Sequence, residues 1–440
     1  MILKKIPILI FLLLVFIAKA QNEFITIWKT QNAQLIKFPG RGTNFKVYWE
    51  EVGYPQHNGT MNNVTSTTEF IVNLGTPLNP SPSQASYRIK ISDGNGSFDQ
   101  VRFYDSTLIP FYSASDRTKI TQIAQWGNIK WKSFDNAFVY CDYMDVTATD
   151  APDLSMVTST REMFYLCTSL IGNPSFNTWN TSNITNMYYM FGDDYQFNQP
   201  LGNWDTSNVT DMSYMFDNTG YNQSLAKWNT AKVTTMEHMF HTAENFNQNL
   251  DNWNTASVTN MNEMFHDTAF NQNIGRWNLS SLTTATGMFL NSAMSCLNYD
   301  KTLYGWSQSA STPANINLSS ASPLVYSHAD AVAARNYLIN NKGWTISGDS
   351  YNGLCNQTLS TSEKEINSKA AIYPNPVQDY IYLKNIQNPV SYIITDMSGR
   401  TVVKDQLDYE KINVRLLTPG NYILQILTKN EIHSLQFIKQ

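Results

Sequence analysis

The segment Phe197–Phe216, FNQPLGNWDTSNVTDMSYMF, is one copy of a unit that the chain repeats seven times at intervals of 24 to 27 residues. In five copies a tryptophan is followed twelve residues later by a phenylalanine, and an asparagine stands six residues before the tryptophan. The tryptophans are Trp179, Trp204, Trp228, Trp253 and Trp277, the phenylalanines Phe191, Phe216, Phe240, Phe265 and Phe289, and the asparagines Asn173, Asn198, Asn222, Asn247 and Asn271. Two earlier copies run from Trp126 to Phe138 and from Pro152 to Phe164.

The length of the unit varies only between each phenylalanine and the next asparagine. Fixed core spacing with one variable loop is typical of a solenoid, because each coil must place its core residues over those of the coil before it. Within the quoted copy, Val209 lies among Ser, Thr and Asn and predicts a short strand. Met212, Met215 and Phe216 follow at the i, i+3 and i+4 spacing of one buried helical face. Asp211 suits the N-cap of that helix. We therefore expect an α/β solenoid of seven coils, each with a short strand and a short helix.

The quoted unit and its copies resemble the BspA-like leucine-rich-repeat surface proteins of bacteria, from Trp126 to about Trp344. This resemblance implies a leucine-rich-repeat-like solenoid exposed on the cell surface and, for some members, adhesion to host proteins or other cells. It does not imply an enzyme. We place the solenoid at residues 120–297.

The segments before the solenoid predict export and a small β domain. Lys4 and Lys5, an apolar run and Ala18-Lys19-Ala20 are typical of a secretory signal at residues 1–20, cleaved between Ala20 and Gln21. No apolar run is long enough for a transmembrane span. Residues 21–119 alternate apolar and polar residues between turns and predict a small antiparallel β-sandwich, which resembles a degenerate PKD-type domain.

The segments after the solenoid predict a cap, a linker and a second β-sandwich. Residues 298–355 break the repeat and include a helical pattern, as expected of a C-terminal cap, and residues 356–370 are a polar linker. Residues 371–440 alternate again around turns. Their order of Tyr-Pro-Asn-Pro, Ser-Gly-Arg and LTPGNYIL resembles the C-terminal sorting domain of the type IX (Por) secretion system of Bacteroidetes. The resemblance implies that the secretion machinery is a partner and that the protein is secreted or held on the outer-membrane surface.

Four cysteines suit an oxidising compartment. Cys141 and Cys167 each lie three residues after the phenylalanine of adjacent coils, so stacking would bring their backbones within disulfide reach, and we predict that they pair. Cys296 and Cys355 then remain and would staple the segment that ends the solenoid. The alternative is four free or mispaired thiols.

Sequence motifs for catalysis, cofactors and phosphate binding are not recognisable, so we expect no enzyme and no cofactor. One column of side chains is a candidate metal site. Asp217, His241 and His266 each follow the phenylalanine of three consecutive coils and should stack about 5 Å apart. Two imidazoles and a carboxylate can hold zinc. Such a column is more often a solvated edge, so we predict no bound metal.

The formal net charge is −5 without a basic run, which argues against a nucleic-acid partner. Two hypotheses for the function remain. The first hypothesis is a non-catalytic surface protein that mediates adhesion or binding to an extracellular protein or glycan. The alternative is a polysaccharide-binding accessory module of a carbohydrate-degrading system, in which a row of tryptophans would stack on sugar rings. Because aromatics at an invariant interval are usually core residues, we favour the first.

Overall fold

The computed structural model describes residues 22–31, 33–105, 112–113, 116–353, 371–384, 386, 389–397, 400–406, 411–428 and 432–440. The chain divides into two compact units, Met1–Leu359 and Ser360–Gln440. The predicted signal segment, its cleavage site at Ala20 and Gln21, residue Cys355 and the predicted linker 356–370 lie outside the described residues.

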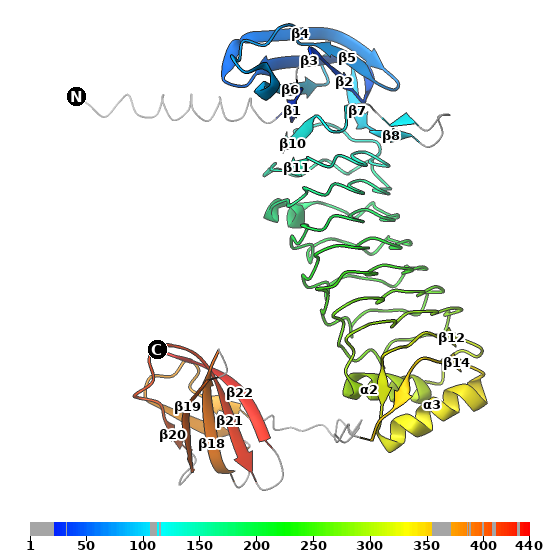
Figure 1. Cartoon of the computed structure of the whole chain (residues 1–440), viewed down its shortest axis with the longest axis vertical. Coiled ribbons are helices and arrows are strands. Elements are labelled where there is room, and N and C mark those ends of the chain that lie inside the picture. Colours follow the sequence, from blue (N-terminus) through cyan, green and yellow to red (C-terminus); the bar gives the residue numbers. More distant parts are fainter. Residues whose placement is uncertain are drawn as a thin grey trace. The chain divides into compact units, whose positions relative to one another are not determined.

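The first unit begins with a seven-stranded sheet in the order β11-β10-β1-β6-β3-β4, with β7 paired to β3 (Figure 1). Its strands are β1 (Phe24–Lys29), β3 (Gly40–Glu51), β4 (Tyr54–Ser66), β6 (Ser86–Ser92), β7 (Ser97–Val101), β10 (Ile120–Gln125) and β11 (Asp145–Val146). Strands β1 and β6 bury every second residue, as their alternating sequence predicts. Outside this sheet, β2 (Leu35–Phe38) pairs with β5 (Phe70–Asn73), β8 (Tyr104–Asp105) pairs with β9 (Tyr112–Ser113), and η1 (Pro82–Gln84) is a short 3₁₀ helix.

The sheet continues into a stack of coils. Strand β10 pairs in parallel with β11, which belongs to the first coil, and Gln100 of β7 forms a parallel bridge with Ser133. Figure 1 shows the coils lying one on another. Their buried side chains and those of the sheet form one continuous core.

Aromatic columns run along the inside of the stack. Successive tryptophan rings from Trp179 to Trp277 have centroids 6.0 to 6.5 Å apart. Successive phenylalanine rings from Phe164 to Phe289 lie 5.7 to 6.2 Å apart. Each tryptophan and phenylalanine in these columns is at most 3% exposed. No single coil could bury these faces alone, so the stack is the folding unit.

The helix that we predicted in each coil is absent, and the expectation of an α/β leucine-rich-repeat-like solenoid is wrong. The described residues contain two α-helices, and both lie beyond the last coil. In the segment from Met187 to Asp193, alternate backbone N–H groups form hydrogen bonds to the next coil. Those of Met187, Tyr189, Phe191 and Asp193 donate to its carbonyls at 2.8 to 3.1 Å. The intervening N–H groups of Met190 and Gly192 bond three residues back. These are successive tight turns bonded across coils.

Backbone conformation explains why the helix cannot form. In every coil the residues two before and two after the phenylalanine have positive φ, a left-handed conformation that interrupts an α-helix. Those before it are Asn136, Glu162, Tyr189, Tyr214, His238, Glu263 and Gly287, and those after it are Tyr140, Leu166, Asp193, Asn218, Thr242, Asp267 and Asn291. Since tight turns also bury the methionines and phenylalanine on one side, the sequence pattern resembled that of a helix.

The predicted strand is likewise reduced to single bridges. Asn186, Asp211, Thr235, Asn260 and Thr284 form isolated parallel bridges from coil to coil. The side chain of Asp211, predicted as an N-cap, accepts the N–H of Ser213 at 2.9 Å and closes a turn. The asparagines before the tryptophans form a ladder, in which Asn198 Oδ1 accepts the N–H of Asn222 at 2.9 Å and so on to Ser295.

Two helices and short parallel strand pairs close the far end of the stack. Helix α2 (Cys296–Gln308) carries Trp306, whose ring packs on Phe289 at 6.2 Å, and α3 (Ala329–Lys342) packs against α2. The N–H groups of Ala285 and Gly287 in the last coil donate to Asn317 and Ser319. The strands here are β12 (Asn317–Leu318) with β14 (Thr345–Ile346) and β13 (Val325–Tyr326) with β15 (Ser350–Tyr351), and η2 (Pro174–Thr178) is a 3₁₀ turn within the third coil.

The second unit contains two antiparallel sheets around its own core. One has the order β16-β17-β20, from β16 (Ala371–Tyr373), β17 (Tyr380–Lys384) and β20 (Lys411–Asn413); the other has the order β19-β18-β21-β22, from β18 (Pro389–Asp396), β19 (Thr401–Gln406), β21 (Gly420–Thr428) and β22 (Ile432–Lys439). In the described parts of both units, neither helix is long and apolar enough to cross a membrane.

Candidate functional site

The most distinctive group of ionisable side chains lies along the loop edge of three consecutive coils. The structure brings together Asp217, His241 and His266, the column identified in the sequence. His241 Nδ1 lies 2.7 Å from Asp217 Oδ1, and the rings of His241 and His266 have centroids 4.8 Å apart. The two backbone turns that flank each phenylalanine place these residues at equivalent positions.

Two further residues, not singled out from the sequence, complete the cluster. His238 and Glu263 each lie two residues before the phenylalanine, at a left-handed position that turns their side chains toward the same edge. Glu263 Oε2 lies 3.0 Å from His266 Nδ1, 3.7 Å from His241 Nε2 and 3.9 Å from His238 Nδ1. The signal in the sequence was a second column with the same period, occupied in turn by Tyr189, Tyr214, His238 and Glu263.

Aromatic stacking fixes the cluster from one side. The His238 ring stacks on Tyr214 with centroids 4.5 Å apart, and Tyr214 stacks on Tyr189 at 4.6 Å. The Tyr189 hydroxyl donates to Asp217 Oδ2 at 3.0 Å. Asp217 therefore accepts from both Tyr189 and His241, which holds the imidazole of His241 in one orientation.

The pKa values of the two central histidines are shifted in opposite directions. The hydrogen bond to Asp217 raises the pKa of His241, whereas burial lowers the pKa of His238. Side-chain exposures of 19% for His238 and 24% for His241 leave both reachable from solvent.

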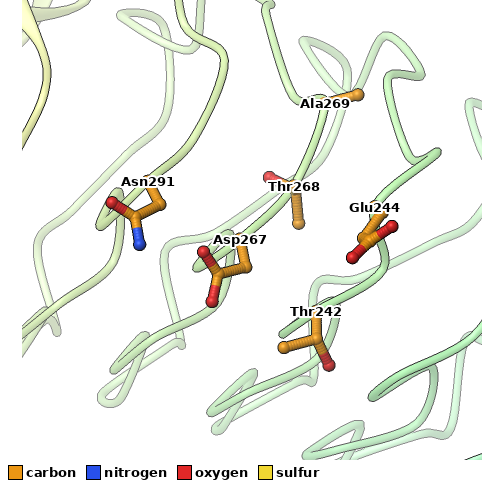
Figure 2. A pocket seen from close by; sticks show the side chains of 6 residues that line it. All are labelled: Thr242, Glu244, Asp267, Thr268, Ala269 and Asn291. Atoms are coloured by element: carbon orange, nitrogen blue, oxygen red, sulfur yellow. The ribbon is translucent and has the colours of Figure 1, made fainter.

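A surface pocket of about 460 Å³ adjoins the cluster. It is lined by Thr242, Glu244, Asp267, Thr268, Ala269 and Asn291, shown in Figure 2. Asp267 connects it to the cluster, because its Oδ2 lies 3.2 Å from His266 Nε2. The lining is polar and acidic, which suits hydroxyl or cationic groups more than apolar ones.

The repeated tryptophans do not form an exposed surface. From Trp204 to Trp277 their indole N–H groups donate to carbonyls of the coil before, for example from Trp204 to Phe176 at 2.6 Å and from Trp253 to Leu225 at 3.1 Å. Since the rings are buried and stacked on one another, they offer no face to a sugar.

Exposed apolar side chains occur instead in the loops of three earlier coils. Tyr143, Ile171 and Tyr195 are 59%, 49% and 51% exposed. Hydrogen bonds hold these loops in register: Ile171 N–H donates to Asp145 Oδ1 at 3.0 Å, and Gln196 Nε2 donates to the carbonyl of Thr168 at 3.0 Å. We call Tyr143, Ile171 and Tyr195 the loop patch.

The predicted bond between Cys141 and Cys167 is wrong. Both are buried free thiols. The sulfur of Cys167 lies 3.0 Å from the carbonyl oxygen of Phe138, to which its S–H donates. Burial raises the pKa of both thiols and suppresses their reactivity. The pairing predicted for Cys296 involves Cys355, which lies outside the described residues.

Comparison with known families identifies two parts of the chain. Residues 132–232 and 217–325 match the family described as "Mycoplasma protein of unknown function, DUF285". Residues 371–440 match the family described as "Secretion system C-terminal sorting domain". The chain therefore carries a type IX sorting domain and is exported to the cell surface or the extracellular space. A search of curated proteins gave no match.

Proposed function

We propose that the protein is a non-catalytic repeat protein of the cell surface that binds an extracellular protein or glycan through the loop edge of its coils. Export by the sorting domain places the coils outside the cell, where such a partner is available. The resemblance to BspA-like surface repeats and the repeat-family match are consistent with this role.

The observation that carries the proposal is the loop patch. Isolated exposed apolar residues are common, whereas contiguous ones mark interaction surfaces. We propose that these three side chains, which lie in the loops of successive coils, form such a surface. The patch is rigid, because Gln199 Nε2 donates to the carbonyl of Ile171 at 3.1 Å and Asn218 Nδ2 donates to the Tyr195 hydroxyl at 3.3 Å. A rigid surface loses little conformational entropy when it binds.

The test is binding of the purified chain to an array of glycans and extracellular-matrix proteins. Saturable binding that is lost when Tyr143, Ile171 and Tyr195 are all changed to serine supports the proposal and identifies the class of partner. Met156→Ser and Tyr351→Ser serve as controls, because these side chains are 55% and 62% exposed outside the patch. Binding that survives the triple change, or no binding by the folded chain, would refute it.

A further inference from the structure

We propose that His238, His241 and Glu263 form a binding site for a divalent transition-metal ion of the zinc class. These three residues each offer one ligand atom, and the atoms all lie within 4.8 Å of one another. They come from two adjacent coils, so a bound ion would join the coil of His238 and His241 to that of Glu263.

The distances from Glu263 to His238 and His241 exceed those of hydrogen bonds, although the same oxygen is hydrogen-bonded to His266. Glu263 Oε2 lies 3.7 Å from His241 Nε2 and 3.9 Å from His238 Nδ1, beyond the usual range of a hydrogen bond. Ligand atoms around tetrahedral zinc stand roughly 3.3 Å apart, as bonds of about 2.0–2.1 Å require. A movement of under about 1 Å at the end of the Glu263 side chain would bring its oxygen to that separation from both nitrogens. That side chain is 35% exposed and has room to move.

A second, independent feature is the carboxylate behind His241. When Asp217 accepts the Nδ1–H, the lone pair of His241 is left on Nε2, the atom that faces Glu263. Metal-binding histidines are commonly held in this way by a carboxylate that fixes the tautomer. Tyr189 donates to the other oxygen of Asp217 and extends the support outward. Asp217, identified in the sequence as a ligand candidate, thus becomes a positioning residue.

His266 contacts Glu263 and Asp267 at the edge of the proposed site. Its Nδ1 lies 3.0 Å from Glu263 Oε2 and its Nε2 lies 3.2 Å from Asp267 Oδ2. Three protein ligands leave a fourth position for water or for a group from a partner.

Calorimetric titration of the purified, chelator-treated full chain with zinc chloride at pH 7.5 tests the site. We expect saturable binding of one ion per chain. His238→Gln, His241→Gln or Glu263→Gln should weaken binding by more than tenfold, and Asp217→Asn by about 10- to 100-fold. His57→Gln is the matched control, because His57 Nδ1 also lies 2.6 Å from a carboxylate, that of Glu51, outside the cluster. Absence of saturable binding, or an equal effect of the control, would overturn the proposal.

Two further measurements distinguish binding at this cluster from loss of folding in a variant and from binding by the thiols. Zinc should raise the melting temperature of the wild type but not that of His241→Gln, which also shows whether that variant is folded. Cobalt(II) bound to the wild type should show visible bands without intense sulfur charge-transfer absorption, and the same spectrum in a Cys141→Ala, Cys167→Ala double variant. Loss of the bands in that variant would assign the metal to the thiols and refute the site. None of these readouts depends on an extracellular partner, so the test is independent of the proposed adhesive function.

Discussion

The indole Nε1 of Trp228 donates a 3.0 Å hydrogen bond to the carbonyl oxygen of Leu201 in the coil before it. The same carbonyl accepts the backbone N–H of Trp204 at 3.1 Å. From Trp204 to Trp277 the tryptophan column therefore combines apolar burial with one directional bond per coil, which links each coil to its neighbour.

This bond predicts a difference between two otherwise similar substitutions. Trp228→Phe should lower the free energy of unfolding by about 1–2 kcal/mol more than Trp179→Phe, because the buried Trp179 Nε1 has no hydrogen-bond partner among the described residues. Urea unfolding followed by circular dichroism measures both. Equal losses would show that the indole bond contributes nothing beyond ring packing.

Asp194 has a buried side chain with only one of its two oxygens paired, because Oδ1 accepts the N–H of Cys167 at 2.8 Å. It lies three residues after Phe191, where the later coils have Thr219 and Thr268, and both threonines donate to the carbonyl of their own phenylalanine. Asp194 Oδ2 is buried without a partner in the described structure, and burial raises the pKa of its carboxyl well above 3.8. Asp194→Thr should therefore stabilise the protein at pH 7 by about 1–3 kcal/mol, measured as a rise in melting temperature.

The gain from Asp194→Thr should depend on pH. The pKa of Asp194 is higher in the folded state than in the unfolded state. Its ionisation therefore does not reduce the stability of the fold below the unfolded pKa of 3.8, and stability is lost as the pH rises through the folded pKa. The difference in melting temperature between variant and wild type should grow from pH 4 to pH 8. A difference that is constant over this range would assign the effect to packing instead.

Thr242 occupies a left-handed position that suits asparagine better. Its φ is 52°, and a β-branched residue is strained there, whereas the equivalent Asn218 and Asn291 tolerate φ values of 53° and 54°. Thr242→Asn should stabilise the chain by about 1 kcal/mol, and the reverse change Asn291→Thr should destabilise it by a similar amount. Chemical denaturation measures the two effects, and the same sign for both would show that backbone strain does not govern stability at this position.

The state of the cysteines can be read by alkylation without reductant. Cys141 and Cys167 should resist iodoacetamide in the native protein and react once the chain is unfolded, because both thiols are free and buried. Peptide mass spectrometry distinguishes the sites. The same digest tests the pairing still predicted for Cys296 with Cys355, whose peptides should remain linked. Failure of Cys141 or Cys167 to react in denaturant would indicate that the thiol is bonded.

Much of the coil was predictable from the sequence, and the failures have one physical cause. The period placed Trp204, Val209 and Phe216 in the core, where they are buried. The i, i+3, i+4 spacing of Met212, Met215 and Phe216 then suggested a helix, because burial on one side is common to a helix and to successive tight turns. The two differ in backbone conformation, because the tight turns need a positive φ at residues such as Tyr214. A positive φ cannot be predicted from the sequence when the residue is not glycine.

The same error limited the prediction of the candidate site. The column of Asp217, His241 and His266 follows from the period alone. The contribution of Glu263 depends on the left-handed turn at that residue, and the hydrogen bond from the Cys167 thiol to the Phe138 carbonyl depends on a side-chain rotamer. A repeat period fixes which residues are neighbours along the stack but not where their side-chain atoms point.

The closure of both ends of the stack sets its length. At one end Lys132 N–H donates to Asp99 of the sheet, and at the other Ala285 N–H donates to Asn317. Each coil otherwise presents the same rows of donors and acceptors as its neighbours, which is the requirement for growth into a fibre. Because the terminal segments occupy those rows, the number of coils in a stack is set by the length of the sequence and not by the protein concentration. Loss of the segment that begins at residue 298 would leave donors of the last coil, such as the Ala285 N–H, without their partners and open that end to association, while the sheet keeps the other end closed.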